Sequence, residues 1–198
     1  MTVFCHSAYM KANNPWKTYS DDELFTMLGG TKTEADAGFG ELYRRYSYRI
    51  FGYCRRMVGE DRAEDVCQDI FLSFLDHGRK QTSVGNVGAY LFRIAQNKTR
   101  RFKRDETKVA LDEFKEELYS AENHHYEQKE LNQLVVKALD LLPEDQRETL
   151  ALQVYSGMSY KDISSIRQVP INTVKSHILR AKRHIRAILL PFFQNESK

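Results

Sequence analysis

The sequence lacks a long apolar run. Apolar residues make up 41% of its 198 residues, which is enough for packed cores, but no run approaches the roughly 20 residues that a helix needs to cross a bilayer. The longest candidate, residues 188–193, is short and is interrupted by Pro191. The first residues also lack the basic stretch and apolar core of a secretory signal peptide. We therefore expect no membrane insertion and a cytoplasmic location.

Cysteine and the usual signs of catalysis are scarce too. Cys5, Cys54 and Cys67 are an odd number of cysteines without the spacing of a metal site. Cys54 and Cys67 fall within apolar helical patterns, so we expect buried free thiols, which suit a reducing compartment. The sequence offers no glycine-rich loop that could cradle a phosphate and no pairing of a nucleophile with a base. We expect neither a cofactor nor an enzymatic activity.

One group of side chains keeps a metal-dependent nuclease open as an alternative. Its members are potential ligands close together in the sequence, namely Glu122, His124, His125 and Glu127. They lie in a polar stretch without the supporting residues that orient metal ligands. We therefore favour a solvated linker, and a loss of activity on chelation would favour the metal site.

Acidic residues are absent from two segments, although the net charge of the chain is only +3. Residues 93–104 contain six basic residues, and residues 175–186 contain five together with two histidines. Between these segments, residues 105–130 carry nine acids against three lysines. Two basic segments separated by an acidic one indicate two nucleic-acid contacts joined by a solvated linker.

Strand signals are almost absent, whereas helical spacing is common. Apolar residues three and four apart predict a helix that ends near Gly59, a second that begins near Asp61 and a third over residues 89–104. The second helix has an apolar face of Ala63, Val66, Cys67, Ile70 and Phe74 and a separate polar face of Asp65, Gln68 and Asp69. The outer face of the third carries Arg93, Asn97, Arg100, Arg101 and Arg104.

The C-terminal third predicts a compact set of helices. Its first stripe comprises Leu131, Leu134, Val135, Ala138, Leu141 and Leu142. A helix begins near Pro143 and ends at Gly157, and Ser159 caps a short helix over residues 160–166. After a turn at residues 168–170, a last helix begins near Asn172 and is strongly basic. A short capped helix, a tight turn and a basic helix form a helix-turn-helix, which places its second helix in the major groove of DNA.

Several segments, taken in order, resemble the sigma-70 family of RNA polymerase sigma factors, extracytoplasmic-function subfamily. Residues 39–104 resemble region 2 of that family, through residues 39–46, 63–71 and 90–97. Residues 131–190 resemble region 4, through residues 142–147, 157–163, 173–176 and 180–182. Each motif alone is moderately specific, and the order and separation of the motifs make the resemblance strong.

The resemblance implies an all-α fold of two small helical domains joined by a charged linker. We expect an N-terminal extension at residues 1–18, region 2 at 19–104, an acidic linker at 105–130, region 4 at 131–190 and a tail at 191–198. Region 2 of the family binds core RNA polymerase and captures bases of the promoter −10 element, and region 4 binds the −35 duplex. The implied partners are core RNA polymerase, promoter DNA and an anti-sigma factor.

The resemblance also assigns contact residues. Those expected to bind polymerase are Asp65, Gln68, Asp69 and Phe71. Those expected at the −10 element are Tyr90, Arg93, Asn97, Arg100, Arg101 and Arg104. Those expected at the −35 element are Thr173, Lys175, Ser176, His177, Leu179, Arg180, Lys182 and Arg183. For Tyr90, which stands where the family usually has tryptophan, a place in the core and a contact with an unpaired base are both open.

The sequence departs from the family pattern around the helix-turn-helix. Arg167 and Gln168 replace a commoner Leu–Gly pair, so we expect Gln168 to adopt a left-handed conformation at a cost of about 1–2 kcal/mol. His177 stands where arginine is common, and Asn172 replaces a usual glycine as a helix N-cap. The loop at residues 82–88 lacks an aromatic residue that the family often has. These departures bear on which −10 and −35 sequences are recognised.

Two other interpretations compete with a sigma factor. The first is a stand-alone helix-turn-helix regulator, such as the output domain of a response regulator. Residues 39–104 argue against it, because they show no α/β pattern of a phosphoacceptor domain. The second is a polymerase-binding factor that does not contact DNA, and the two basic helices argue against that.

Overall fold

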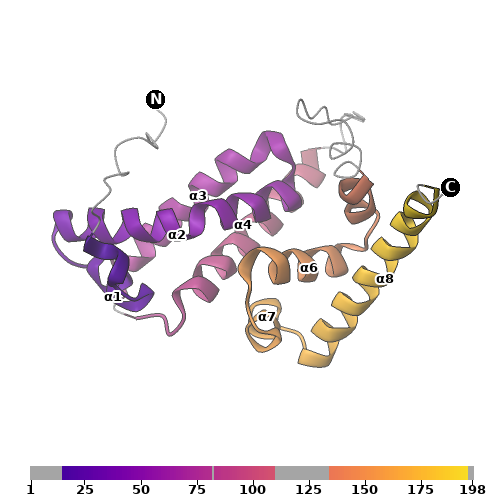
Figure 1. Ribbon diagram of the computed structural model, residues 1–198. Coiled ribbons are helices and arrows are strands. Elements are labelled where there is room, and N and C mark those ends of the chain that lie inside the picture. Colours follow the sequence, from indigo (N-terminus) through magenta and orange to yellow (C-terminus); the bar gives the residue numbers. More distant parts are fainter. Residues whose placement is uncertain (1–14, 82, 110–133, 196–198) are drawn as a thin grey trace. The chain divides into compact units, whose positions relative to one another are not determined.

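The computed structural model describes residues 15–81, 83–109 and 134–195, and within these ranges every regular element is a helix (Figure 1). The chain divides into two compact units between Phe102 and Lys103. The predicted all-α class with two helical parts is thereby confirmed. The four potential metal ligands at residues 122–127 lie outside the described residues.

The first unit begins with a short 3-10 helix and continues with α-helices: η1 (Pro15–Thr18), α1 (Asp21–Met27), α2 (Lys32–Val58), α3 (Glu60–Gly78) and α4 (Val87–Val109). The boundary between the units falls within α4, after Phe102. Local sequence sets where these helices begin and end. Ser20 and Thr31 each form a capping box with the glutamate three residues later, which starts α1 and α2. Gly59 ends α2 at a φ of 85°, a conformation that glycine adopts at little cost.

Helix α4 is longer at both ends than the predicted helix over residues 89–104. Asn86 caps its start, because its Oδ1 accepts a hydrogen bond of 2.8 Å from the N–H of Ala89. Gly88, which the sequence suggested as part of a loop, lies inside the first turn. A Cβ at Gly88 would lie 2.9 Å from the Tyr46 hydroxyl, so the glycine lets α4 pack closely against α2.

The core of the first unit contains the apolar stripes that the sequence predicted. The stripe of α3 is exposed by no more than 7% and comprises Ala63, Val66, Cys67, Ile70 and Phe74. Tyr53 of α2 meets Phe92 of α4 edge to face, with ring centroids 5.9 Å apart. Cys54 and Cys67 are buried free thiols, as expected, whereas Cys5 lies outside the described residues.

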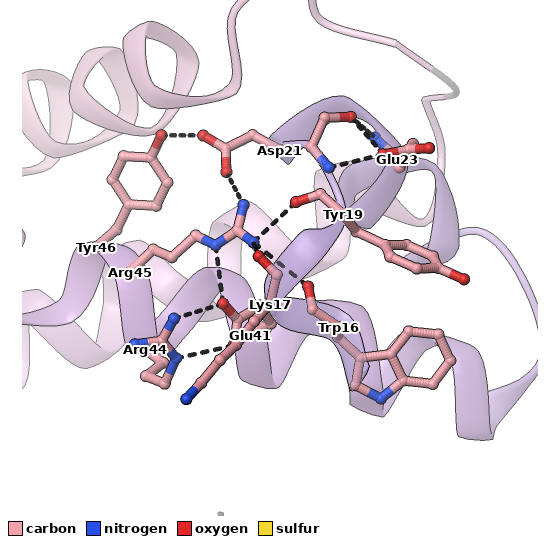
Figure 2. Close-up of polar contacts among 10 residues, drawn as sticks. Trp16, Lys17, Tyr19, Asp21, Glu23, Glu41, Arg44, Arg45 and Tyr46 are labelled. Atoms are coloured by element: carbon pink, nitrogen blue, oxygen red, sulfur yellow. Dashed lines mark hydrogen bonds and ion pairs between the residues drawn. The ribbon is translucent and has the colours of Figure 1, made fainter. Parts of the chain in front are cut away.

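Arg45 of α2 joins the start of the first unit to its core (Figure 2). Its guanidinium forms ion pairs with Asp21 at 2.6 Å and with Glu41 at 2.9 Å. It also donates hydrogen bonds to three backbone carbonyls, those of Trp16, Lys17 and Tyr19. The carbonyls at the end of a short helix need donors, and Arg45 supplies them. Residues 15–18 therefore pack onto the folded unit, whereas the other residues of the extension predicted at 1–18 lie outside the described residues.

Glu41 is the buried acid of this network. It is only 2% exposed, and it accepts hydrogen bonds from Arg44 at 2.6 and 2.8 Å and from Arg45. These hydrogen bonds, chiefly those from Arg44, lower the pKa of Glu41 below that of an ordinary glutamate, against the opposing effect of burial. A buried carboxylate is tolerated here because two guanidinium groups satisfy it.

The second unit contains a helical segment over residues 134–140, then α6 (Glu144–Ser156), α7 (Tyr160–Arg167) and α8 (Ile171–Asn195). Gly157 ends α6 in the left-handed conformation, and Ser159 caps α7 by accepting from the N–H of Asp162 at 3.2 Å. Both were predicted. The core gathers around Leu142, Leu150 and Ala181, with Leu139 and Ile185 packed against it.

The first apolar stripe of this unit is only partly as predicted. Ala138 and Leu142 are buried, but Leu141 is 71% exposed. The helical segment ends at Asp140, so Leu141 lies in the turn that precedes Pro143 and does not follow the helical spacing. Leu131 lies outside the described residues.

The turn between α7 and α8 matches the prediction for Gln168 but not for Asn172. Gln168 has φ 55° and ψ 41°, in the left-handed region. Helix α8 begins at Ile171, so Asn172 lies within the first turn and is not the N-cap. The carbonyl of Pro170 accepts the first hydrogen bonds of α8, from Thr173 at 2.9 Å and Val174 at 3.2 Å.

Candidate nucleic-acid and protein interfaces

A polar face of α3 is open to solvent. Asp65, Gln68 and Asp69 are all exposed, and their spacing places them on one side of the helix, away from its buried stripe. Carboxylate and amide oxygens on an open face accept hydrogen bonds from a basic partner surface. The structure thus brings together three of the four residues that were predicted to bind polymerase.

The fourth, Phe71, is buried. It is 3% exposed, and its ring centroid lies 4.7 Å from that of Tyr43 and 6.2 Å from that of Phe39. A ring packed against two aromatic residues of α2 cannot reach a partner without opening the core. The structure therefore corrects the predicted contact at Phe71, whose place is in the core between α2 and α3.

Leu72 was not among the residues predicted to bind polymerase. This side chain is 50% exposed and lies four residues after Gln68 and seven after Asp65, which puts it on the same face. The sequence could have indicated its exposure, because Leu72 is an apolar residue of α3 that falls outside the predicted apolar stripe. We define the α3 face as Asp65, Gln68, Asp69 and Leu72.

The outer side of α4 carries the predicted basic residues. All of the following are exposed: Arg93, Asn97, Arg100, Arg101 and Arg104. The opposite side of α4 is buried, including Leu91, Ala95 and Thr99 at 0% exposure. Guanidinium groups in such a row can contact successive phosphates, and an exposed amide can hydrogen-bond to a base edge. This α4 face adjoins the α3 face at Lys98, whose Nζ lies 3.9 Å from Asp69 Oδ2.

Tyr90 lies at the edge of the core and is half-buried. Its ring packs near those of Phe25, Phe74 and His77, with centroid distances of 6.2, 6.3 and 6.3 Å. Burial raises the pKa of its hydroxyl above the usual value of a tyrosine, so the hydroxyl stays protonated at neutral pH. Tyr90 thus combines core packing with a partly open ring, and the sequence had left these two roles open.

The second basic face is on α8. Its exposed members are Lys175, Leu179, Arg180, Lys182 and Arg183. Val174, Ile178 and Ala181, on the opposite side, are 0–3% exposed and hold the helix on its unit. The predicted residues are therefore presented on one helix, positioned by the turn after α7.

Three predicted members of the α8 face are less open. Thr173, Ser176 and His177 are half-buried. The Oγ of Ser176 donates to the carbonyl of Asn172 at 2.8 Å. His177 turns toward α6, where its Nδ1 lies 3.4 Å from Thr149 Oγ1. His177 thus also helps to hold α8 on α6.

Two kinds of feature are absent from the described part of the chain. Within it, no three His, Cys, Asp or Glu residues are grouped so as to hold a metal ion. None of its helices has the length and apolar character needed to cross a membrane.

Known families match both halves of the chain. Residues 42–109 match the family model of sigma-70 region 2, and residues 132–185 match that of sigma-70 region 4. The first match spans most of α2, together with α3 and α4. The second spans α6, α7 and most of α8.

Curated relatives agree with these matches. The chain is 35% identical over 134 residues to the ECF RNA polymerase sigma factor EcfG of Rhodopseudomonas palustris, a match covering 65% of this chain and 72% of that protein. It is 29% identical over 176 residues to the RNA polymerase sigma-H factor of Pseudomonas aeruginosa, covering 79% and 88%. It is 28% identical over 164 residues to the ECF RNA polymerase sigma-E factor of Escherichia coli K12, covering 74% and 84%.

Two solved structures have a similar fold. One is the sigma factor RpoE in complex with the anti-sigma factor NepR from Bartonella quintana, with a TM-score of 0.65, 26% identity and coverage of 76% of this chain and 96% of that chain. The other is CnrH in complex with the cytosolic domain of CnrY, with a TM-score of 0.64, 22% identity and coverage of 86% and 97%. The second likeness concerns the fold alone.

Proposed function

The chain belongs to the ECF group of the sigma-70 family, and from this membership we propose how its two helical units share the work of starting transcription. As a sigma factor it binds core RNA polymerase and promoter DNA and directs transcription initiation. Factors of this kind carry the polymerase to a promoter, and the chemistry of RNA synthesis belongs to the polymerase. We propose that this chain has no catalytic activity of its own, needs no cofactor and acts in the cytoplasm.

We propose that the α3 face binds core polymerase. Asp65, Gln68 and Asp69 offer hydrogen-bond acceptors, and Leu72 adds an exposed apolar side chain among them. An apolar anchor surrounded by polar groups is the usual composition of a protein interface. Phe71 contributes from beneath, by fixing α3 on α2.

We propose that the α4 face captures the −10 element. Separating stacked base pairs costs about 1.4 kcal/mol per step, and each base stacked on an aromatic platform returns about 1–3 kcal/mol. Asn97 is exposed and can bond to a base edge, and the partly open ring of Tyr90 can stack. Contacts from the arginines of α4 to phosphates add to this. A few captured bases therefore hold a short open segment without ATP.

We propose that the α8 face reads the −35 duplex. Lys175, Arg180 and Arg183 are exposed and lie on the second helix of the helix-turn-helix, the one that enters the major groove. Leu179, at 50% exposure, offers an apolar contact for the methyl group of thymine. His177 contributes chiefly by its contact with Thr149.

We further propose an anti-sigma factor as a partner. The support is that the solved structure of RpoE, 26% identical to this chain, holds such a factor. The residue assignments to regions also remain our proposal: region 2 at 19–104, the linker at 105–130, region 4 at 131–190 and the tail at 191–198.

One observation carries the proposed function: a polar α3 face and a basic α4 face on one unit accompany a basic helix-turn-helix on the other. A stand-alone regulator needs only the last of these. The test is run-off transcription with purified core polymerase and genomic fragments. We expect promoter-specific transcripts that depend on the chain. If an active preparation produced no such transcripts, the proposal would be refuted. Alanine at Asp65, Gln68 and Asp69 should weaken polymerase binding before it affects DNA contacts.

A further inference from the structure

A buried arginine stands where α7 turns toward α8. Arg167 is the last residue of α7, and its side chain is 2% exposed. Its guanidinium pairs with Glu148, itself 2% exposed, and with Asp145 Oδ1 at 2.5 Å. It also lies 3.4 Å from the carbonyl oxygen of Asp145. The arginine thus holds two side chains and one carbonyl of α6.

The turn that follows Arg167 is tightly tied. Gln168 has a positive φ of 55°, which non-glycine residues rarely adopt. Ser164 Oγ donates to the carbonyl of Val169 at 2.5 Å, and the N–H of Val169 donates back to the carbonyl of Ser164 at 3.2 Å. Pro170 then accepts the first hydrogen bonds of α8. The path from Arg167 to α8 therefore has little freedom, and the direction of α8 depends on where Arg167 is held.

An ion pair at this place differs from an apolar side chain in one respect. An apolar residue would fill the volume, but it would tolerate a rotation of α7 on α6. A planar guanidinium held by two carboxylates tolerates such a rotation poorly, because its hydrogen bonds have fixed directions. The same helix α6 also contacts α8 directly, through Thr149 and His177. Helix α6 thus contacts the last residue of α7, before the turn, and His177 of α8, after it.

We propose that Arg167 is a positioning residue for promoter recognition, which sets the angle of α8 on the −35 duplex through Glu148 and Asp145. This inference rests on the proposed function, because it presumes that α8 reads the −35 element. Arg167 does not itself need to contact DNA, since its side chain is buried.

The main test removes the charges and keeps the volume. In the double variant Arg167→Met/Glu148→Met no buried charge is left unpaired, so stability is expected to match or exceed that of the native chain. Each variant is assembled with core polymerase and assayed on a promoter fragment found by run-off transcription. We expect the double variant to need at least about tenfold more promoter for half-maximal transcription and to discriminate less between single-base changes in the −35 element. Its binding to core polymerase should be unchanged.

A second variant keeps the proposal open to refutation if the double variant does not fold. Asp145 is 69% exposed on its side chain, so Asp145→Asn removes one carboxylate of the pair without burying a lone charge. We expect a loss of about two- to fivefold in promoter affinity and an altered −35 base preference. Glu144→Gln, an equal charge change at the exposed preceding residue, is the control and should leave the base preference intact.

The outcomes separate this inference from the proposed function. A folded double variant with native affinity and native −35 preference would overturn the positioning role, and so would an Asp145→Asn variant that behaves like Glu144→Gln. Failure of the native chain to direct any promoter-specific transcription would instead overturn the proposed function.

Discussion

The ring of Tyr90 on α4 meets the ring of Phe25 on α1 edge to face, with centroids 6.2 Å apart. Phe25 is 1% exposed, whereas Tyr90 is half-buried. The residue proposed to stack on a promoter base is therefore anchored from behind by the core. An aromatic side chain held in this way is already oriented before DNA arrives, which lowers the entropy that is lost on binding.

A substitution series at Tyr90 separates its two roles. Tyr90→Leu keeps much of the apolar volume but removes the stacking surface. We expect a loss of stability below about 1.5 kcal/mol and a larger loss in promoter opening, about tenfold, because one stacked base contributes about 1–3 kcal/mol. Opening is measured by permanganate reactivity of unpaired thymines in the −10 element. Tyr90→Phe keeps the ring and should behave like the native chain. Native opening by Tyr90→Leu would show that Tyr90 serves the core alone.

Neighbouring residues of α3 should respond differently to truncation. Leu72 is 50% exposed and Phe71 is 3% exposed. We expect Leu72→Ala to leave the thermal unfolding temperature nearly unchanged and to weaken core polymerase binding about five- to tenfold, as a truncated interface anchor does. Phe71→Ala should instead lower the free energy of unfolding by about 3–5 kcal/mol. Polymerase binding is measured by competition against a labelled sigma factor. Equal effects of the two substitutions on binding would contradict the division between face and core.

How far the sequence predicted the structure depends on what each residue contacts. The helical stripes of α2 and α3 follow from local spacing, and so do the caps at Ser159 and Gly157, because these are decided within a few residues. Phe71 was misjudged because its burial depends on Tyr43 and Phe39, which are far away in the sequence. The pairing of Arg167 with Glu148 was beyond prediction for the same reason, since the two residues belong to different helices.

The site was predicted less completely than the fold. A basic helical face can be recognised from charge spacing, and the arginines of α4 that this spacing predicted are exposed on one side of the helix. His177 has the same spacing along α8 but turns toward Thr149, which only the packing of α6 decides. The spacing of Glu41 and Arg45 allows an ion pair within one helix, but the contacts of Arg45 with residues 16, 17 and 19 gave no signal. Those partners are backbone carbonyls, which the sequence does not distinguish.

Glu41 should make the first unit sensitive to acid. Hydrogen bonds from Arg44 hold its pKa below the usual 4.5 in the folded chain. A lowered pKa contributes stability that is fully present above the pKa of the unfolded chain and is lost as pH falls through the folded value. We expect the free energy of unfolding to fall with pH below about 4.5, and to fall less steeply in Glu41→Gln. The chain has a single tryptophan, Trp16, so its fluorescence reports on this unit. Exposed Glu64 offers a control, since Glu64→Gln should keep the native slope.

Gln168 marks a place where the native sequence is not the most stable one. Its left-handed conformation, with φ 55°, costs a non-glycine residue about 1–2 kcal/mol. A glycine would avoid this cost, but its greater freedom in the unfolded chain would offset part of the gain in stability. We therefore expect Gln168→Gly to raise the stability of the second unit by up to about 1 kcal/mol. Gln168→Val should lower it, because a β-branched side chain fits this conformation worst. Hydrogen exchange of the amides of α7 and α8 measures both changes, and faster exchange in the glycine variant would contradict the expected gain.

The exposed cations of α8 should act on DNA through phosphate contacts that salt weakens. If Lys175 neutralises one phosphate, Lys175→Ala lowers the slope of log affinity against log salt concentration by about 0.9. The same should hold for Arg183→Ala if Arg183 contacts the DNA backbone. If Arg183 instead reads a base, its loss should cost about 1–3 kcal/mol at one position of the −35 element and reduce the base preference there. Binding of the polymerase complex to promoter DNA, measured at several salt concentrations and with single-base −35 variants, distinguishes these cases.

Lys137 provides a control for this test. It is also exposed in the second unit, but outside the helix-turn-helix, so Lys137→Ala should keep the native slope. A reduced slope in that variant would mean that general attraction to DNA, rather than the α8 face, accounts for the salt dependence.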